Sequence, residues 1–192
     1  MLPTRLTRVV VVALAVLAVA CGAPTKPKAT YANALSSYSL YAFTGAPVNA
    51  ATAISFLGGA ARADASFAFD VAFDLDATGR PIVYPVRAIA SDLAGSVKRV
   101  GLQVVPGAFE SVLQVPATGY DTLSARTVNV GDVIAVQLLD LTSCIYSLGG
   151  QMLYAKLTVD SVNTSARRLY ARTVLDPNCG YRSVVPDSIP TS

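Results

Sequence analysis

Hydrophobic and polar residues alternate with a period of two along most of the chain beyond residue 38. This period is typical of β-strands with one buried face. The clearest example is Ser66–Asp76, where apolar side chains from Phe67 to Leu75 fall on one face and Asp70 and Asp74 fall on the other. Similar runs are Tyr38–Phe43, Ala51–Leu57, Val97–Val105, Phe109–Val115, Asp132–Leu139, Met152–Val162 and Arg168–Leu175. The pattern predicts an all-β fold, with a single antiparallel β-sandwich or barrel-like domain of about nine strands.

Turn residues between these runs predict two hairpins. Residues 76–79 (Asp-Ala-Thr-Gly) join the first run to Pro81–Ala90, and the polar residues 163–166 join Met152–Val162 to Arg168–Leu175. Proline cannot donate to a strand ladder, so Pro81 and Pro85 place their run at a sheet edge or a bulge. Short helical turns are predicted only within residues 32–37 and 92–95.

The first 20 residues have a different pattern. Arg5 and Arg8 precede an unbroken apolar run from Val9 to Ala20. A helix of 12 residues spans about 18 Å, well short of a hydrocarbon core of about 30 Å. The run therefore predicts a signal peptide rather than a permanent membrane span.

The end of this segment, Leu17-Ala18-Val19-Ala20-Cys21-Gly22, resembles the lipobox of bacterial lipoproteins. Small residues precede the cysteine as in that family, although Ala18 stands where leucine is commonest. The resemblance implies cleavage before Cys21, lipidation of its thiol and anchoring by acyl chains. It also implies outer-membrane sorting through Gly22 if two membranes are present. An ordinary secretory signal with a coincidental cysteine and an uncleaved anchor remain alternatives.

These features divide the chain into three parts. Residues 1–20 are the expected signal peptide, residues 21–30 the lipidated cysteine with a flexible tether rich in proline and small residues, and residues 31–192 the β-domain. The expected location is the extracytoplasmic side of a membrane in the cell envelope. The expected partners are that membrane and another envelope protein.

Charge and composition indicate which partners and which chemistry to expect. The formal net charge is +3, but removing Arg5 and Arg8 leaves 13 Lys and Arg residues against 12 Asp and Glu. We therefore expect no nucleic-acid partner, because such proteins concentrate basic residues. The chain has no histidine, the commonest general base and metal ligand near neutral pH.

Two cysteines remain in the domain, Cys144 and Cys179. Export would place both in an oxidising compartment, where an even pair usually forms a disulfide. A reactive or metal-binding pair and two unpaired buried thiols are the alternatives.

One segment superficially resembles a calcium loop. Asp74 and Asp76 begin a D-x-D-x-T-G sequence, but the position where an EF-hand has its glutamate is Pro85. A hairpin turn explains the same residues. We keep Asp74 and Asp76 as a weak metal alternative and otherwise expect no metal and no cofactor.

No familiar catalytic motif occurs: a G-x-S-x-G nucleophile turn and a phosphate-binding glycine loop are both missing. We expect no catalytic residues and no enzyme. Three hypotheses follow: a binding or structural module of the envelope, a small-ligand or glycan-binding module, and a hydrolase without a recognisable motif. The first predicts an exposed apolar or tyrosine patch, and the second a concave pocket lined by tyrosine.

Overall fold

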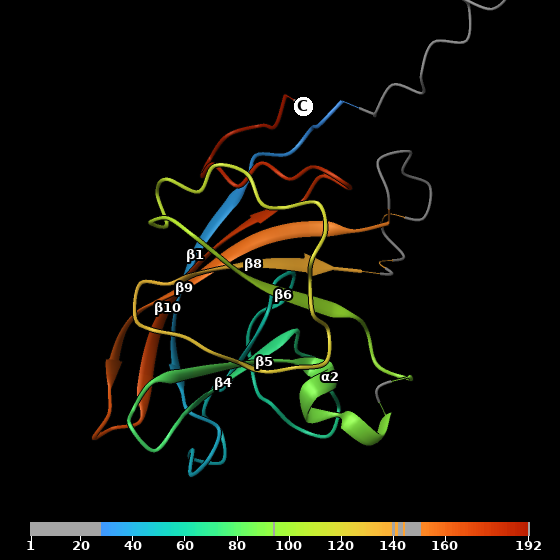
Figure 1. Cartoon of the computed structure of the whole chain (residues 1–192). Coiled ribbons are helices and arrows are strands. Elements are labelled where there is room, and N and C mark those ends of the chain that lie inside the picture. The colour runs from blue at the N-terminus through green and yellow to red at the C-terminus, as the bar shows by residue number, and fades with distance from the viewer. Residues whose placement is uncertain (1–27, 94, 140, 142–143, 145–150, 192) are drawn as a thin grey trace, which may run out of the picture.

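The computed structural model describes residues 28–191 except 94, 140, 142–143 and 145–150. Ten strands of the described residues form two antiparallel five-stranded sheets that pack against each other as a sandwich (Figure 1). The all-β prediction is therefore confirmed, with ten strands rather than about nine.

The larger of the two sheets contains the long strands and is called the large sheet here. In spatial order its strands are β1 (Ala34–Tyr41), β10 (Arg168–Asp176), β9 (Leu153–Asn163), β8 (Val133–Leu138) and β6 (Val100–Val105).

The second, small sheet is built from shorter strands. In spatial order these are β3 (Gly59–Ala61), β2 (Ala53–Ser55), β4 (Val71–Leu75), β5 (Pro81–Pro85) and β7 (Arg126–Thr127). A four-residue helix, α2 (Val86–Ile89), and a 3-10 turn at Ser91–Leu93 follow β5.

The main hydrophobic core lies between the inner faces of the two sheets. Phe69 and Phe73 enter it from the small-sheet side, and Leu40, Leu157 and Leu169 enter it from the large sheet, all with no exposed surface. Alternation along β9 and β10 sends every second side chain into this core, as the sequence predicts.

A second apolar cluster covers part of the outer face of the large sheet. Val133, Ala135, Tyr154 and Val174 project from that face and are buried beneath Phe109, Val112, Val115 and Val184. The covering residues belong to segment 106–116 and the C-terminal segment, which hydrogen-bond to each other. The large sheet is therefore buried on both faces at this end.

The predicted strand Phe109–Val115 is wrong. Gly107 has a φ of 110°, and the carbonyl of Ala108 accepts hydrogen bonds from the N–H groups of Ser111 and Val112. Residues 108–112 therefore form a turn, and the described part of the segment makes a β-bridge between Gln114 and Ser183 in place of the predicted strand.

The strand around Phe73 is shorter and more deeply buried than predicted. Phe67 has a φ of 49°, which ends the alternating run before β4 begins at Val71. Asp74 was expected on a solvent face, but all five residues of β4 are buried because other segments cover both sides of the strand.

The predicted hairpins are confirmed, but the run Pro81–Ala90 is a strand only to Pro85, because the helix α2 begins at Val86. Leu75 pairs with Pro81 across the first turn, and Arg168 pairs with Asn163 across the second. However, β5 is not an edge strand, because β7 pairs with Ile82 and Val83. Pro81 and Pro85 lie at the two ends of β5, so their missing N–H groups leave the residues between them free to pair.

The predicted helical turn at residues 32–37 is also wrong, because β1 already begins at Ala34. The described chain enters and leaves the domain at the same end of the sandwich (Figure 1). Asn33 and Ser188 are hydrogen-bonded there through their backbones, at 2.9 Å.

Candidate binding face on the large sheet

Of the predicted site residues, Cys21 and the signal peptide lie outside the described residues. The Cys144–Cys179 disulfide is present, with a Cα–Cα distance of 5.6 Å. Cys144 follows β8 and Cys179 follows β10, so the bond links the two neighbours of β9 beyond their ends.

The disulfide lies close in sequence to the attachment of the N-terminal segment. Asn178 accepts hydrogen bonds from the N–H groups of Thr30 and Tyr31, at 2.8 and 3.0 Å, and donates to the carbonyl of Tyr31. The junction between the expected tether and the β-domain is thus held by the residue next to Cys179.

Asp74 and Asp76 both accept hydrogen bonds from the chain itself. Asp74 forms an ion pair with Arg167 at 2.7 Å and accepts further bonds from Thr44 and from the N–H of Leu75. This network joins β4 to the β9–β10 turn.

Asp76 closes the β4–β5 turn. It accepts bonds from the hydroxyl and N–H of Thr78 and from the N–H and side chain of Arg80, and these bonds, led by the Thr78 hydroxyl, hold its pKa well below the usual range. Gly79 adopts a φ of 84° in the same turn. Within the described part of the chain, no group of three or more His, Cys, Asp or Glu residues is placed to hold a metal ion.

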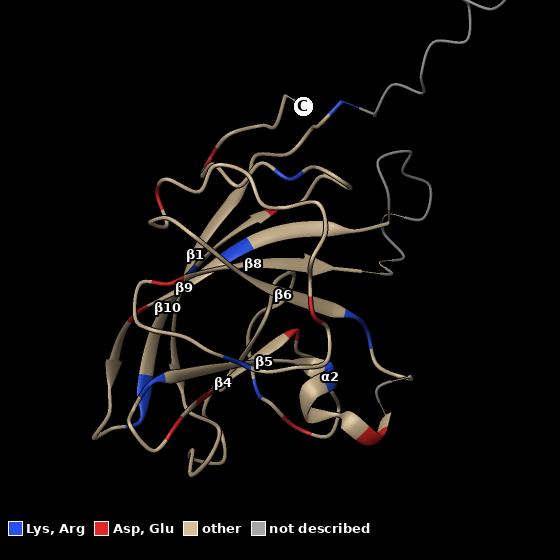
Figure 2. Cartoon of the chain, in the orientation of Figure 1, with Lys and Arg blue, Asp and Glu red and all other residues tan. Residues whose placement is uncertain are grey.

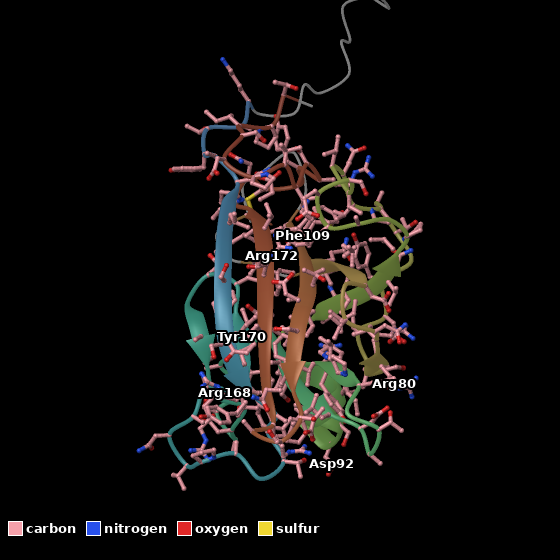
Figure 3. All side chains as sticks on the ribbon, turned by 90° about the vertical axis from the view of Figure 1, so that its left-hand side faces the viewer. Arg80, Asp92, Phe109, Arg168, Tyr170 and Arg172 are labelled. Carbon is pink, nitrogen blue, oxygen red and sulfur yellow. A yellow bond between two sulfur atoms is a disulfide. The ribbon has the colours of Figure 1, made fainter. Side chains whose placement is uncertain are left out.

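An exposed polar surface lies on the part of the large sheet's outer face that the second apolar cluster leaves open. We call it the outer β1–β10 face. Figure 3 shows Arg168, Tyr170 and Arg172 following one another along β10, with Phe109 beyond them. The residues of this face are Ser37, Ser39, Tyr41, Asp160, Arg168, Tyr170 and Arg172.

Arg172 is fully engaged within the domain. Its guanidinium binds both carboxylate oxygens of Asp160 at 2.9–3.0 Å and Glu110 at 3.1 Å. It also lies 4.7 Å from the ring centre of Phe109. The hydrogen bonds that Arg172 donates to Asp160 are the largest cause of its raised pKa. Its role is to connect segment 106–116 to the sheet.

Arg168 is bonded very differently. Its Nη2 donates to the Ser39 hydroxyl at 2.6 Å, and the guanidinium lies 5.1 Å from the ring centre of Tyr41 and 5.7 Å from that of Tyr170. Its Nε is buried without a hydrogen-bond partner, and no described carboxylate forms an ion pair with this arginine. Among the described residues, Arg168 thus has one hydrogen-bond partner and no charge partner.

An open hollow of about 330 Å³ lies on this face, beside Arg172. It is lined by Ser37, Ser39, Asp160, Tyr170 and Arg172, together with Tyr38 and Ala171. Tyr170 is 41% exposed, a large value for an aromatic side chain in the middle of a strand. Hydroxyl groups, the Asp160–Arg172 ion pair and a tyrosine ring thus surround a shallow surface.

Lys156 is the residue that sequence reasoning missed. Alternation along β9 places it on the outer face, where a lysine is expected in water, yet it has no exposed surface. Its ammonium donates to the carbonyls of Phe109 and Val112, at 2.6 and 2.9 Å, and lies 4.4 Å from the Phe109 ring centre. Burial lowers the pKa of this amine, while the charge of Glu110 opposes the effect.

This contact has a structural explanation. The carbonyls in the turn at residues 108–112 are not paired with a neighbouring strand. A cation at the end of a helical turn satisfies such carbonyl groups. Lys156 therefore fixes segment 106–116 on the sheet. No local signal in the sequence reports this, because the covering segment lies more than 40 residues away.

Charged residues elsewhere are dispersed. Figure 2 shows Lys and Arg segments scattered over both sheets and the loops, with Asp and Glu between them. In the described residues, no helix has the length and apolar character needed to cross a bilayer. Comparisons with protein-family models, characterised proteins and solved structures gave no match to this chain.

Proposed function

We propose that this chain is an exported lipoprotein of the cell envelope, anchored through acyl chains on Cys21, whose non-catalytic domain binds another envelope protein through the outer β1–β10 face. The observation that carries the binding role is Arg168. A guanidinium flanked by two tyrosines, without an ion-pair partner in the described structure, is a typical binding residue, since Arg and Tyr are enriched at the centres of protein interfaces.

Two further features support export and anchoring. The Cys144–Cys179 disulfide suits an oxidising compartment rather than the cytoplasm. The chain also enters the domain beside Asn178 at one end of the sandwich, while the outer β1–β10 face runs along the side of the domain (Figure 3). A partner in the same envelope layer could approach such a side face without meeting the tether.

Anchoring is tested by fractionation of cells that express the full chain or Cys21→Ser. We expect the unmodified chain to stay in the membrane pellet after an alkaline wash and the variant to be released. Retention of the variant in the pellet would show that lipid on Cys21 is not the anchor.

Binding is tested separately with a photo-reactive amino acid at position 39, next to Arg168. The matched control carries the same group at the exposed Ala60 of β3, in the small sheet. We expect one discrete protein adduct from position 39 that Arg168→Gln diminishes, and none from position 60. Equal adducts from both positions would contradict the assignment of the binding face.

A small-ligand or glycan-binding module is the second candidate. The hollow lined by Tyr170, Ser37 and Ser39 favours it, because convergent hydroxyls and a tyrosine ring suit a polar ligand. Under this alternative, position 39 would give no protein adduct, while glycans from the envelope would protect Tyr170 from chemical modification.

A further inference from the structure

The four edge strands of the two sheets differ in how far they are protected. β3 has three residues and β7 has two, and the backbone of Asp121 covers β6 through two hydrogen bonds with Leu102, at 2.9 and 3.1 Å. β1 is eight residues long and contains no charged residue and no proline. Proteins usually protect long edge strands with such residues, because an open edge can pair with another chain.

The hydrogen bonds at the two ends of β1 identify which of its backbone groups face outward. The N–H of Ala42 bonds to the carbonyl of Arg167, the residue before β10. The backbone groups of even-numbered residues of β1 therefore point toward β10, and those of odd-numbered residues point away. At the outward positions, Tyr41 bonds to the carbonyl of Ala51 and Asn33 to that of Ser188.

Between these two ends the described residues supply no neighbouring strand. Leu35, Ser37 and Ser39 direct their N–H and carbonyl groups away from the sheet, and no described backbone group bonds to them. We call Leu35–Ser39 the free edge of β1. Five residues correspond to a length of about 17 Å.

Solvent reaches this edge from the inner side as well. Ser36 and Tyr38 point toward the core yet are partly exposed, whereas their partners on β10, Thr173 and Ala171, are 2% and 1% exposed. The small sheet therefore does not close over the edge.

A second copy of the chain fits the free edge poorly. Antiparallel pairing about a two-fold axis at Ser37 would put Asn33 of the second copy opposite Tyr41, where Ala51 already lies. Moving the axis to Leu35 or Ser39 meets the same obstruction from Ser188 or Ala51. An extended segment of about five residues, which turns away at both ends, meets neither.

The outer face beside the edge defines the chemistry of such a segment. A residue opposite Ser39 on an added strand lies about 4.8 Å from it and shares its face. The Ser39 hydroxyl already accepts from Nη2 of Arg168, and no described carboxylate pairs with this guanidinium. A carboxylate on the added strand can reach that guanidinium, and at the other end Leu35, 45% exposed, offers an apolar contact.

We propose that the free edge of β1 accepts a short extended segment of a partner protein as an added strand, with an acidic residue opposite Ser39 and an apolar residue opposite Leu35. Backbone hydrogen bonds to Leu35, Ser37 and Ser39 hold the segment, and Arg168 selects the acidic side chain. This inference deepens the protein-binding function proposed above. Its test does not depend on anchoring through Cys21.

The probe is the capped pentapeptide Glu-Val-Thr-Val-Leu, titrated into the full chain in detergent and followed by amide NMR. Its first residue would lie opposite Ser39 and its last opposite Leu35 in an antiparallel arrangement. We expect hydrogen exchange at the amides of Leu35, Ser37 and Ser39 to slow about tenfold at a free peptide concentration nine times the Kd. The amides of Ser36 and Tyr38, already bonded to β10, serve as internal controls.

Two changes separate the backbone contribution from the charge. A peptide with Gln in place of Glu, or Arg168→Gln in the protein, should weaken binding about fivefold to tenfold, because a charge-assisted hydrogen bond becomes a neutral one. Ser37→Pro should abolish binding while keeping the fold, because the N–H it removes points away from β10.

The proposal is overturned if the three outward amides exchange at the same rate with and without peptide, or if Ser37→Pro binds as well as the unchanged protein. It is also overturned if the free chain sediments as a dimer that Ser37→Pro dissociates, because a second copy would then occupy the edge. If Ser37→Pro fails to fold, the exchange rates of the unchanged protein with and without peptide still test the proposal. A protein that binds the probe but remains in the membrane pellet as Cys21→Ser would refute the anchor alone.

Discussion

Replacing both Cys144 and Cys179 by alanine tests how far the disulfide stabilises the domain. The bond connects the chain beyond β8 to the chain beyond β10, across the intervening strand β9. Cys144 is 1% exposed, so alanine rather than serine is the appropriate replacement, because it adds no buried hydroxyl. Reduction of the unchanged protein provides a second route to the same state.

The expected loss follows from the length of the loop that the bond closes. The two cysteines are 35 residues apart. In the chain-entropy model a loop of this length corresponds to about 3.8 kcal/mol at 25 °C. For a domain of this size, 1 kcal/mol changes the midpoint of thermal unfolding by about 2–4 °C, so the midpoint should fall by about 8–15 °C.

Thermal unfolding followed by circular dichroism, with and without reductant, measures this effect. Reductant should lower the midpoint of the unchanged protein to that of the double variant and should leave the variant unaffected. A decrease of less than 3 °C would refute the reasoning, because it would mean that the bond scarcely restricts the unfolded chain.

Two further predictions concern Lys156 and the β4–β5 turn. Because burial lowers the pKa of Lys156, the folded chain binds fewer protons than the unfolded chain between that lowered pKa and about 10.4, so stability should rise with pH across this interval. Denaturant unfolding between pH 8 and pH 10.5 should show this rise, and Lys156→Met should lack it; a difference between the two proteins that does not change with pH would contradict the assignment. Gly79→Ala should destabilise the fold more than Gly45→Ala, because both positions have positive φ but only at Gly79 would the new Cβ lie 2.7 Å from Thr164. The conformational penalty alone is about 1–2 kcal/mol, and equal losses of unfolding free energy in the two variants would mean that Thr164 moves away without cost.

The sequence by itself determined the local elements of this protein. Alternation along Met152–Val162 and Arg168–Leu175 predicted β9, β10 and their turn, since a period of two is a property of the strand backbone. The disulfide was also predictable, because only Cys144 and Cys179 remain once Cys21 is assigned to lipid. The lipidation of Cys21 stays a prediction.

Only the tertiary structure decided what lies against each face of a strand. Alternation groups Lys156 with exposed positions, but segment 106–116 covers it and supplies two carbonyls to its ammonium. The same segment was predicted as a strand because apolar residues that pack on a sheet resemble apolar residues within one. Arg168 and Ser39 are 129 residues apart, so their contact, and the free edge beside it, depend on which strands become neighbours. Strand order is a non-local property, and the spacing of residues along the chain does not encode it.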